Sequence, residues 1–175
     1  MRSFSRFALA LASTSLLLAA CGGGGDAPAD GAATPSTDAT AATDGPEAVL
    51  ALGKTKYEQV CITCHMADGN GTPGVFPSLV GSEWALTSEV NVPISIVLHG
   101  LQGPISVKGE TYESVMQPWG MIPDAEIAAI LTYVRSSWGN SASAVTPAQV
   151  AAVREAEGAR AAWTADELKA KYPSM

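Results

Sequence analysis

The stretch Cys61-Ile62-Thr63-Cys64-His65 decides how the rest of this chain is interpreted. Two cysteines three positions apart lie on one side of a helical turn, where their sulfur atoms can bond the two vinyl groups along one edge of a haem. The histidine that follows can then reach the haem iron beneath the ring. The motif occurs once, so the sequence predicts one covalently attached haem c per chain, with His65 as a ligand of the iron.

Other uses of this motif are less well supported. A structural zinc site needs four ligands; the motif supplies three, and only His99 could complete the set. A thioredoxin-like CxxC pair expects a βαβ pattern around it, and no strand-rich pattern surrounds this one. A plain disulfide would leave His65 without a role. We therefore favour haem attachment over zinc, redox-active thiols and a structural disulfide.

The first 20 residues have the pattern of an export signal. Two arginines precede an apolar stretch over residues 7–20, which is too short to span a bilayer. The ending Leu18-Ala19-Ala20-Cys21 resembles the lipobox of bacterial lipoproteins. That resemblance implies a periplasmic protein whose lipidated Cys21 anchors it to a membrane, and Gly22 at the next position favours the outer membrane. An ordinary signal peptide with an incidental cysteine is the alternative.

The next segment is a predicted linker. Residues 22–45 contain only Gly, Ala, Asp, Thr, Pro and Ser, so we expect them to be disordered and to tether a folded domain. The formal net charge of the whole chain is −7, and loss of a signal peptide with two arginines and no acidic residue would lower it to −9. This balance argues against nucleic acid as a partner and against docking on anionic lipid.

The folded part is predicted to begin with a helix at Pro46, which suits a first helical position and leads into the cysteine motif. Here the chain resembles the class I c-type cytochromes. In that family a glycine and an aromatic residue precede the first haem cysteine by eight and four positions, as Gly53 and Tyr57 do. The resemblance implies that the last core helix crosses closely at the glycine, with Ile130 and Tyr133 at the crossing.

The same resemblance implies roles for two residues that follow a glycine-rich loop. Pro77 lies twelve residues after His65, where the carbonyl group of the family's proline accepts a hydrogen bond from the histidine ring. Such a bond fixes the imidazole and raises its donor strength. Leu79, two positions further on, matches a leucine that packs against the haem edge.

A second iron ligand is expected from a methionine. A thioether is a soft ligand that suits haem iron and raises its reduction potential. Met116 precedes Gln117-Pro118-Trp119-Gly120, which is similar to the family's segment after its ligand methionine, so Met116 is our predicted ligand. Met121 is the competing methionine. His99 is a further alternative, although a histidine there is more often a structural hydrogen-bonding residue.

The remaining pattern predicts an all-α protein, the cytochrome c fold with extra C-terminal helices. We expect helices over residues 93–101, 122–137 and 147–160, a turn over residues 107–110, and a capping box at Thr164. The predicted organisation is a signal peptide at 1–20, a lipidated cysteine and linker at 21–45, a cytochrome c domain at 46–140 and a helical extension at 141–175. The sequence does not say whether the extension packs on the domain or on a partner.

The predicted function is one-electron transfer in the periplasm, with no substrate chemistry by the chain itself. Its expected partners are redox proteins: a dehydrogenase, a reductase or a terminal oxidase. One alternative is a dedicated cytochrome subunit of a periplasmic dehydrogenase or reductase. The other is a haem sensor or enzyme whose distal ligand is labile.

Overall fold

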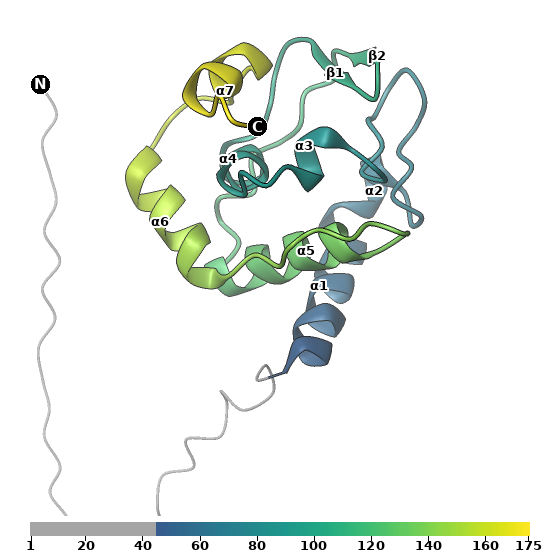
Figure 1. Ribbon diagram of the computed structural model, residues 1–175, viewed down its shortest axis with the longest axis vertical. Helices are drawn as coiled ribbons and strands as arrows, with labels where there is room; N and C mark the ends of the chain where they lie inside the picture. The colour runs from purple at the N-terminus through teal and green to yellow at the C-terminus, as the bar shows by residue number, and fades with distance from the viewer. Residues whose placement is uncertain (1–44) are drawn as a thin grey trace, which may run out of the picture. The chain divides into compact units, whose positions relative to one another are not determined.

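Helix α1, Pro46–Val60, crosses helix α5, Asp124–Ser136, and this crossing holds the two ends of the predicted cytochrome domain together. The computed structural model describes residues 45–175, which belong to one compact unit (Figure 1). The predicted signal peptide, Cys21 and the predicted linker up to residue 44 lie outside the described residues.

The close approach of α1 and α5 depends on the glycine that the sequence places there. Gly53 is buried, and a methyl group built on it would lie 2.8 Å from Cβ of Tyr133. One turn later, Tyr57 is only 1% exposed, and its ring packs against those of Tyr133 and Trp138, with centroids 5.6 and 5.2 Å away. The expected glycine–aromatic crossing is therefore present in the structure.

The remaining elements follow α1 in a mostly helical order, which confirms the expected fold class. Within residues 45–175 the only β-sheet is one short two-stranded hairpin. The elements are α2 (Ile62–His65), α3 (Glu83–Leu86), α4 (Asn91–His99), β1 (Ile105–Val107), β2 (Glu110–Tyr112), α5, α6 (Pro147–Glu157) and α7 (Ala165–Lys171). Helix α4 begins two residues before the predicted Pro93 and ends at His99, because Gly100 takes a φ of +79°.

The hairpin contains the predicted turn. Strands β1 and β2 pair antiparallel, with Val107 opposite Glu110, and the two residues between them, Lys108 and Gly109, both have positive φ. Positive φ at both central residues is characteristic of the type I′ turn, one of the two common two-residue hairpin turns. The carboxylate of Glu83 accepts hydrogen bonds from the Lys108 backbone N–H, and this contact ties the turn to α3.

The C-terminal helices pack on the rest of the domain. The sequence alone did not say whether they would pack there or on a partner. Helix α6 begins with a complete capping box at Thr146 and buries Val150 and Val153 against residues of α4 and α5. Helix α7 also begins with a capping box, at Thr164, and buries Leu168. Figure 1 shows α6 and α7 following α5 around the side of the molecule where α4 lies.

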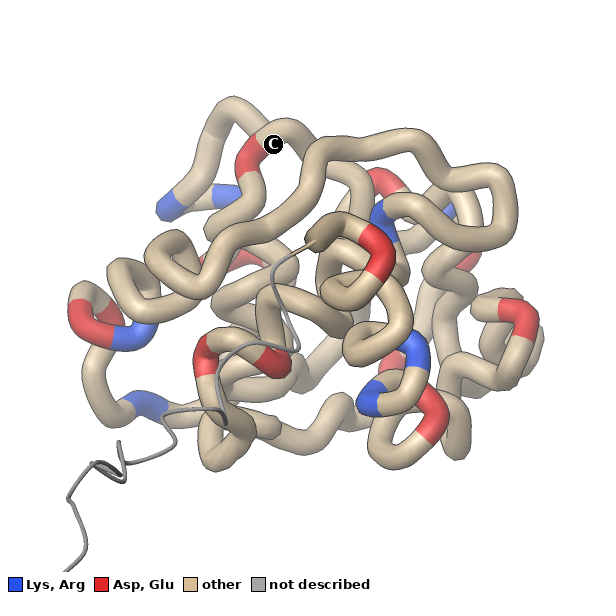
Figure 2. The backbone as a smooth tube through the Cα atoms, turned by 90° about the horizontal axis from the view of Figure 1, so that it is seen from below, with Lys and Arg blue, Asp and Glu red and all other residues tan. Residues whose placement is uncertain are grey.

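Acidic and basic residues both occur on the face of the molecule seen from below (Figure 2). Figure 2 shows basic and acidic positions interspersed on the helices and loops, with no continuous basic stripe in that view. Among the described residues, no helix is both long enough and apolar enough to cross a bilayer.

Candidate haem site

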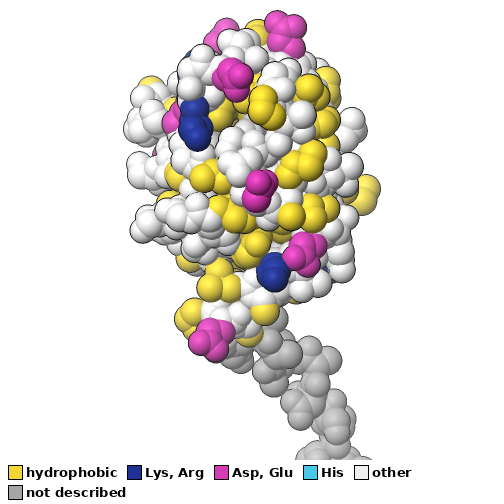
Figure 3. Space-filling model, turned by 90° about the vertical axis from the view of Figure 1, so that its right-hand side faces the viewer, with side chains coloured by type: hydrophobic (Ala, Val, Ile, Leu, Met, Phe, Trp, Pro, Cys, Tyr) yellow, Lys and Arg dark blue, Asp and Glu magenta, His cyan; other side chains and the backbone are white. Residues whose placement is uncertain are grey.

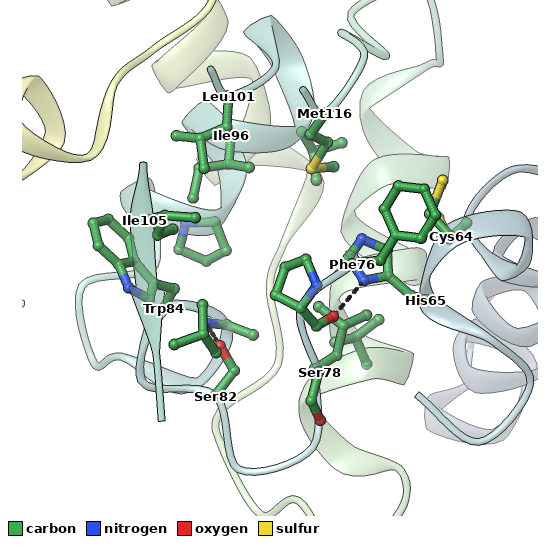
Figure 4. Close-up of a pocket in the computed structure, with 18 of the residues that line it drawn as sticks. Cys64, His65, Phe76, Ser78, Ser82, Trp84, Ile96, Leu101, Ile105 and Met116 are labelled. Carbon is green, nitrogen blue, oxygen red and sulfur yellow. Dashed lines mark hydrogen bonds between the residues drawn. The ribbon is translucent and has the colours of Figure 1, made fainter. Parts of the chain in front are cut away.

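The elements enclose a cavity of about 170 Å³, lined chiefly by apolar side chains. Its walls come from α1, α2, α3, α4, α5, the hairpin and the loops at residues 76–82 and 114–119. Figure 4 shows His65 and Phe76 on one side of this space, Met116 across from His65, and Trp84 and Ile105 at the far end. Residues distant in sequence thus form one pocket with few polar groups.

His65 is held so that one ring nitrogen is left for a ligand. Its Nδ1 lies 3.0 Å from the backbone oxygen of Pro77, so Nδ1–H donates to that carbonyl and Nε2 carries the free lone pair (Figure 4). Burial lowers the pKa of His65, although the bond to Pro77 acts in the opposite direction. The ring is therefore neutral at pH 7, as an iron ligand must be.

Cys61 lies between α1 and α2, Cys64 lies within α2, and both line the cavity as free thiols. The structure does not pair them in a disulfide. Burial, and secondarily the nearby Cys64 thiol, raises the pKa of the Cys61 thiol to about 12. Within residues 45–175, no group of three or more His, Cys, Asp and Glu side chains is arranged to hold a metal ion.

Met116 lines the cavity, whereas the other two distal candidates do not. Figure 4 shows the Met116 sulfur on the side of its chain that faces the His65 ring. Met121 is 88% exposed and is absent from the cavity wall. His99 also lies outside this wall; its Nε2 is 3.1 Å from a carboxylate oxygen of Glu157 on α6. Pro77 and Leu79 both contribute to the lining.

Sequence reasoning missed several residues that shape this site. Trp84 and Ile105 close the far end of the cavity, and the indole N–H of Trp84 donates to the backbone of Ser106. Asn140 joins the loop after Leu79 to the end of α5 by donating to the carbonyl groups of Leu79 and Val134. No local motif marks these residues, since each acts through contacts with distant segments.

Comparison with known proteins identifies this arrangement. Residues 50–138 match the family described as "Cytochrome c". The chain belongs to the cytochrome c family. The match covers α1 from residue 50 onward, the cysteine motif, the cavity and α5, and it ends before α6.

Curated relatives of this cytochrome include two kinds of protein. It is 38% identical over 92 residues to a cytochrome c-552 of Thermus thermophilus, a match that covers 51% of this chain and 70% of the relative. It is 34% identical over 108 residues to the fructose dehydrogenase cytochrome subunit of Gluconobacter japonicus, covering 58% of this chain but 22% of the relative. The gluconate 2-dehydrogenase cytochrome c subunit of Pantoea cypripedii is 32% identical over 115 residues, covering 62% of this chain and 25% of that subunit.

The residues of this cytochrome fit a covalently attached haem c. The two free thiols of the motif, an imidazole whose Nδ1 bonds to Pro77 and a thioether across from it all border one apolar cavity. A haem needs such a site, because its large faces are apolar and its iron accepts a ligand on each side. Family membership and the cysteine pair together imply one haem c attached at Cys61 and Cys64.

Proposed function

We propose that this cytochrome is a one-electron carrier of the periplasm, of the class I type, in which His65 and Met116 are the two iron ligands of the haem. The observation that carries the proposal is that His65 and Met116 border the same apolar cavity from different segments, while Met121 does not. With both ligands bound, no coordination position stays open for a substrate. The bound haem supplies the redox chemistry by changing between Fe(III) and Fe(II).

The chain's own residues contribute positioning and exclusion of water. The carbonyl of Pro77 holds the His65 ring in one orientation and strengthens it as a donor. The thioether of Met116, a soft and neutral ligand, favours the reduced iron. The apolar walls, Leu79 among them, keep water from both iron ligands. A ligand set that is the same in both oxidation states keeps the structural rearrangement on electron transfer small.

Transfer to other proteins would take place in short encounters. Figure 3, which looks at the side where α2 and the hairpin lie in Figure 1, shows apolar side chains spread among few charged ones. Surfaces of this kind suit the small and weak interfaces of redox partners. The partners that we propose are a dehydrogenase, a reductase or a terminal oxidase.

The optical spectrum of the haem-loaded protein tests the ligand assignment. The parent protein should show the sulfur-to-iron charge-transfer band of the oxidised state and should not bind carbon monoxide when reduced. Met116→Ala should lose the band and bind carbon monoxide. Met121→Ala is the matched control, since Met121 is exposed, and it should behave as the parent does. Ready binding of carbon monoxide by the parent protein would instead favour a sensor or enzyme.

We also propose that Cys21 carries a lipid that anchors the protein to a membrane, with the outer membrane favoured. The support is the lipobox-like sequence before Cys21. Growth with a labelled fatty acid tests this: the parent protein should incorporate the label and sediment with membranes, whereas Cys21→Ser should do neither. Separation of the inner and outer membranes would then identify the location.

A second candidate function is that of a dedicated dehydrogenase subunit. It is favoured by the similarity to the cytochrome subunits of fructose and gluconate dehydrogenases. Truncation after Asn140 would not test it cleanly, because α6 buries Val150 and Val153 in the cytochrome's own core. Mild solubilisation of the full-length protein followed by size separation does test it. A dedicated subunit should migrate with a large dehydrogenase partner, and a free carrier should migrate alone.

A further inference from the structure

The backbone of Met116 is held by a segment that is not part of its own loop. Its N–H donates to the carbonyl of Leu101 over 2.9 Å, and its carbonyl accepts from the Leu101 N–H over 3.1 Å. Figure 4 shows the two residues side by side above the cavity. The position of the methionine sulfur therefore depends on where residues 100–102 lie.

That supporting segment is in turn held by the C-terminal extension. The Trp163 N–H donates to the carbonyl of Gly100 over 3.0 Å, and the Gln102 N–H donates to the carbonyl of Trp163 over 2.8 Å. Leu101 thus pairs with Met116 on one side and with Trp163 on the other. Trp163, which is 5% exposed, comes from the connection between α6 and α7.

The other end of the methionine loop is fixed by a single side chain of α6. The guanidinium of Arg154 donates to the carbonyl of Gly120 through Nη1 and to that of Ile122 through Nη2, over 3.0 Å for the latter. Its Nε lies 2.8 Å from the carboxylate of Asp124, at the start of α5. The single planar guanidinium group of Arg154 therefore binds three residues in the segment that leads from Met116 into α5.

We propose that the C-terminal extension, acting through Arg154 and Trp163, holds the Met116 loop closed over the haem and so sets how firmly the methionine stays on the iron. This inference rests on the proposed ligation by Met116. The extension lies beyond residues 50–138, the part that matches the cytochrome c family, so it is an addition that reaches back to the distal ligand. Arg154 is a positioning residue, since it touches the loop and not the haem.

The test is competition between Met116 and imidazole for the oxidised iron in the full-length, haem-loaded protein. Arg154→Ala should bind imidazole about tenfold more tightly than the parent, because three hydrogen bonds from a charged group no longer oppose displacement of the loop. The pH at which the charge-transfer band of Arg154→Ala fades should also be lower than the pH at which the band of the parent fades. Arg154→Lys, which can reach only part of the set, should give an intermediate gain of about threefold.

Thr146→Ala separates positioning from general destabilisation. This substitution removes the hydroxyl oxygen that accepts the capping hydrogen bond from the Gln149 N–H, at the start of the same helix, and leaves every contact of Arg154 in place. It should lower the unfolding midpoint and leave imidazole affinity and the band unchanged. An equal loosening in Thr146→Ala and Arg154→Ala would overturn the proposal, as would parent-like imidazole affinity in Arg154→Ala.

Two outcomes separate this inference from the proposed function. If Met116→Ala leaves the band and the imidazole affinity as in the parent, the ligand assignment itself fails. If Met116→Ala changes both and the Arg154 variants change neither, only the role of the extension fails. Should Arg154→Ala yield no haem-loaded protein, Arg154→Lys decides the question, and parent-like imidazole affinity in that variant counts against the proposal.

Discussion

Replacing Gly53 with alanine would add one methyl group at the point where α1 crosses α5. The new carbon would overlap the carbonyl oxygen of Ala129 and would lie 2.7 Å from its carbonyl carbon and 2.8 Å from Cβ of Tyr133. Two of these three atoms are backbone, so no side-chain rotation can relieve the contact. The two helices must move apart, and the Tyr57 cluster beneath them must follow.

The magnitude follows from two opposing effects. Overpacking of this kind costs up to about 3 kcal/mol, and the better helix propensity of alanine returns about 1 kcal/mol. We therefore expect Gly53→Ala to lower the free energy of unfolding by up to about 2 kcal/mol. This net loss is the reverse of what a glycine-to-alanine change does at an exposed helical site.

Denaturant titration of the haem-loaded protein measures the difference, and a second variant calibrates it. Ala51→Gly lies two residues earlier on the exposed side of α1, so it should lose about 1 kcal/mol from propensity alone. If Gly53→Ala proved as stable as the parent while Ala51→Gly lost stability, the crossing would tolerate a methyl group, and the steric reasoning would be refuted.

Two further predictions concern buried polar groups. The side chain of Glu157 is only 1% exposed. Burial would raise its pKa, but hydrogen bonds from Lys171, Ser95 and Tyr172 outweigh burial and lower it. Its stabilising contribution is therefore present above a pH of about 4.5 and is lost as the pH falls through its lowered value. Glu157→Gln should therefore unfold more easily at pH 7, by about 2 kcal/mol, and should show a flatter loss of stability under acid in a denaturant titration repeated at several pH values; an unchanged acid slope would contradict this. Asn140→Ala should lose about 1–3 kcal/mol in the same titration at pH 7, because buried carbonyl groups would lose their donor, and a loss below about 0.5 kcal/mol would contradict that accounting.

Local chemistry made much of the structure predictable from the sequence. Pro46 marks the start of α1, and Thr146 and Thr164 mark the starts of α6 and α7, because each signal acts within one helical turn. The turn at Lys108 and Gly109 was predictable for the same reason. Pro77 was predicted differently, from the resemblance to the class I c-type cytochromes, and its carbonyl does accept a hydrogen bond from the His65 ring.

Contacts between distant backbones could not be predicted in this way. The pairing of Leu101 with Met116 and Trp163 involves only main-chain groups, which every residue type except proline carries in full. Buried charges are equally hidden: Arg135 is 1% exposed and donates to the carbonyl groups of Ala85 and Thr87, although arginine is ordinarily a surface residue. Residue identity alone gives no sign of such partners.

The pairing of α1 with α5 also has a consequence for the order in which the protein is assembled. A ribosome delivers α1 and the cysteine motif well before the helix that packs over Gly53 and Tyr57. A lone fifteen-residue helix is marginally stable in water. Until α5 has been made, α1 lacks its packing partner and no side chains of α5 enclose Cys61 and Cys64. The growing chain thus passes through a stage in which its two thiols are accessible from every side, and completion of α5 brings that stage to an end.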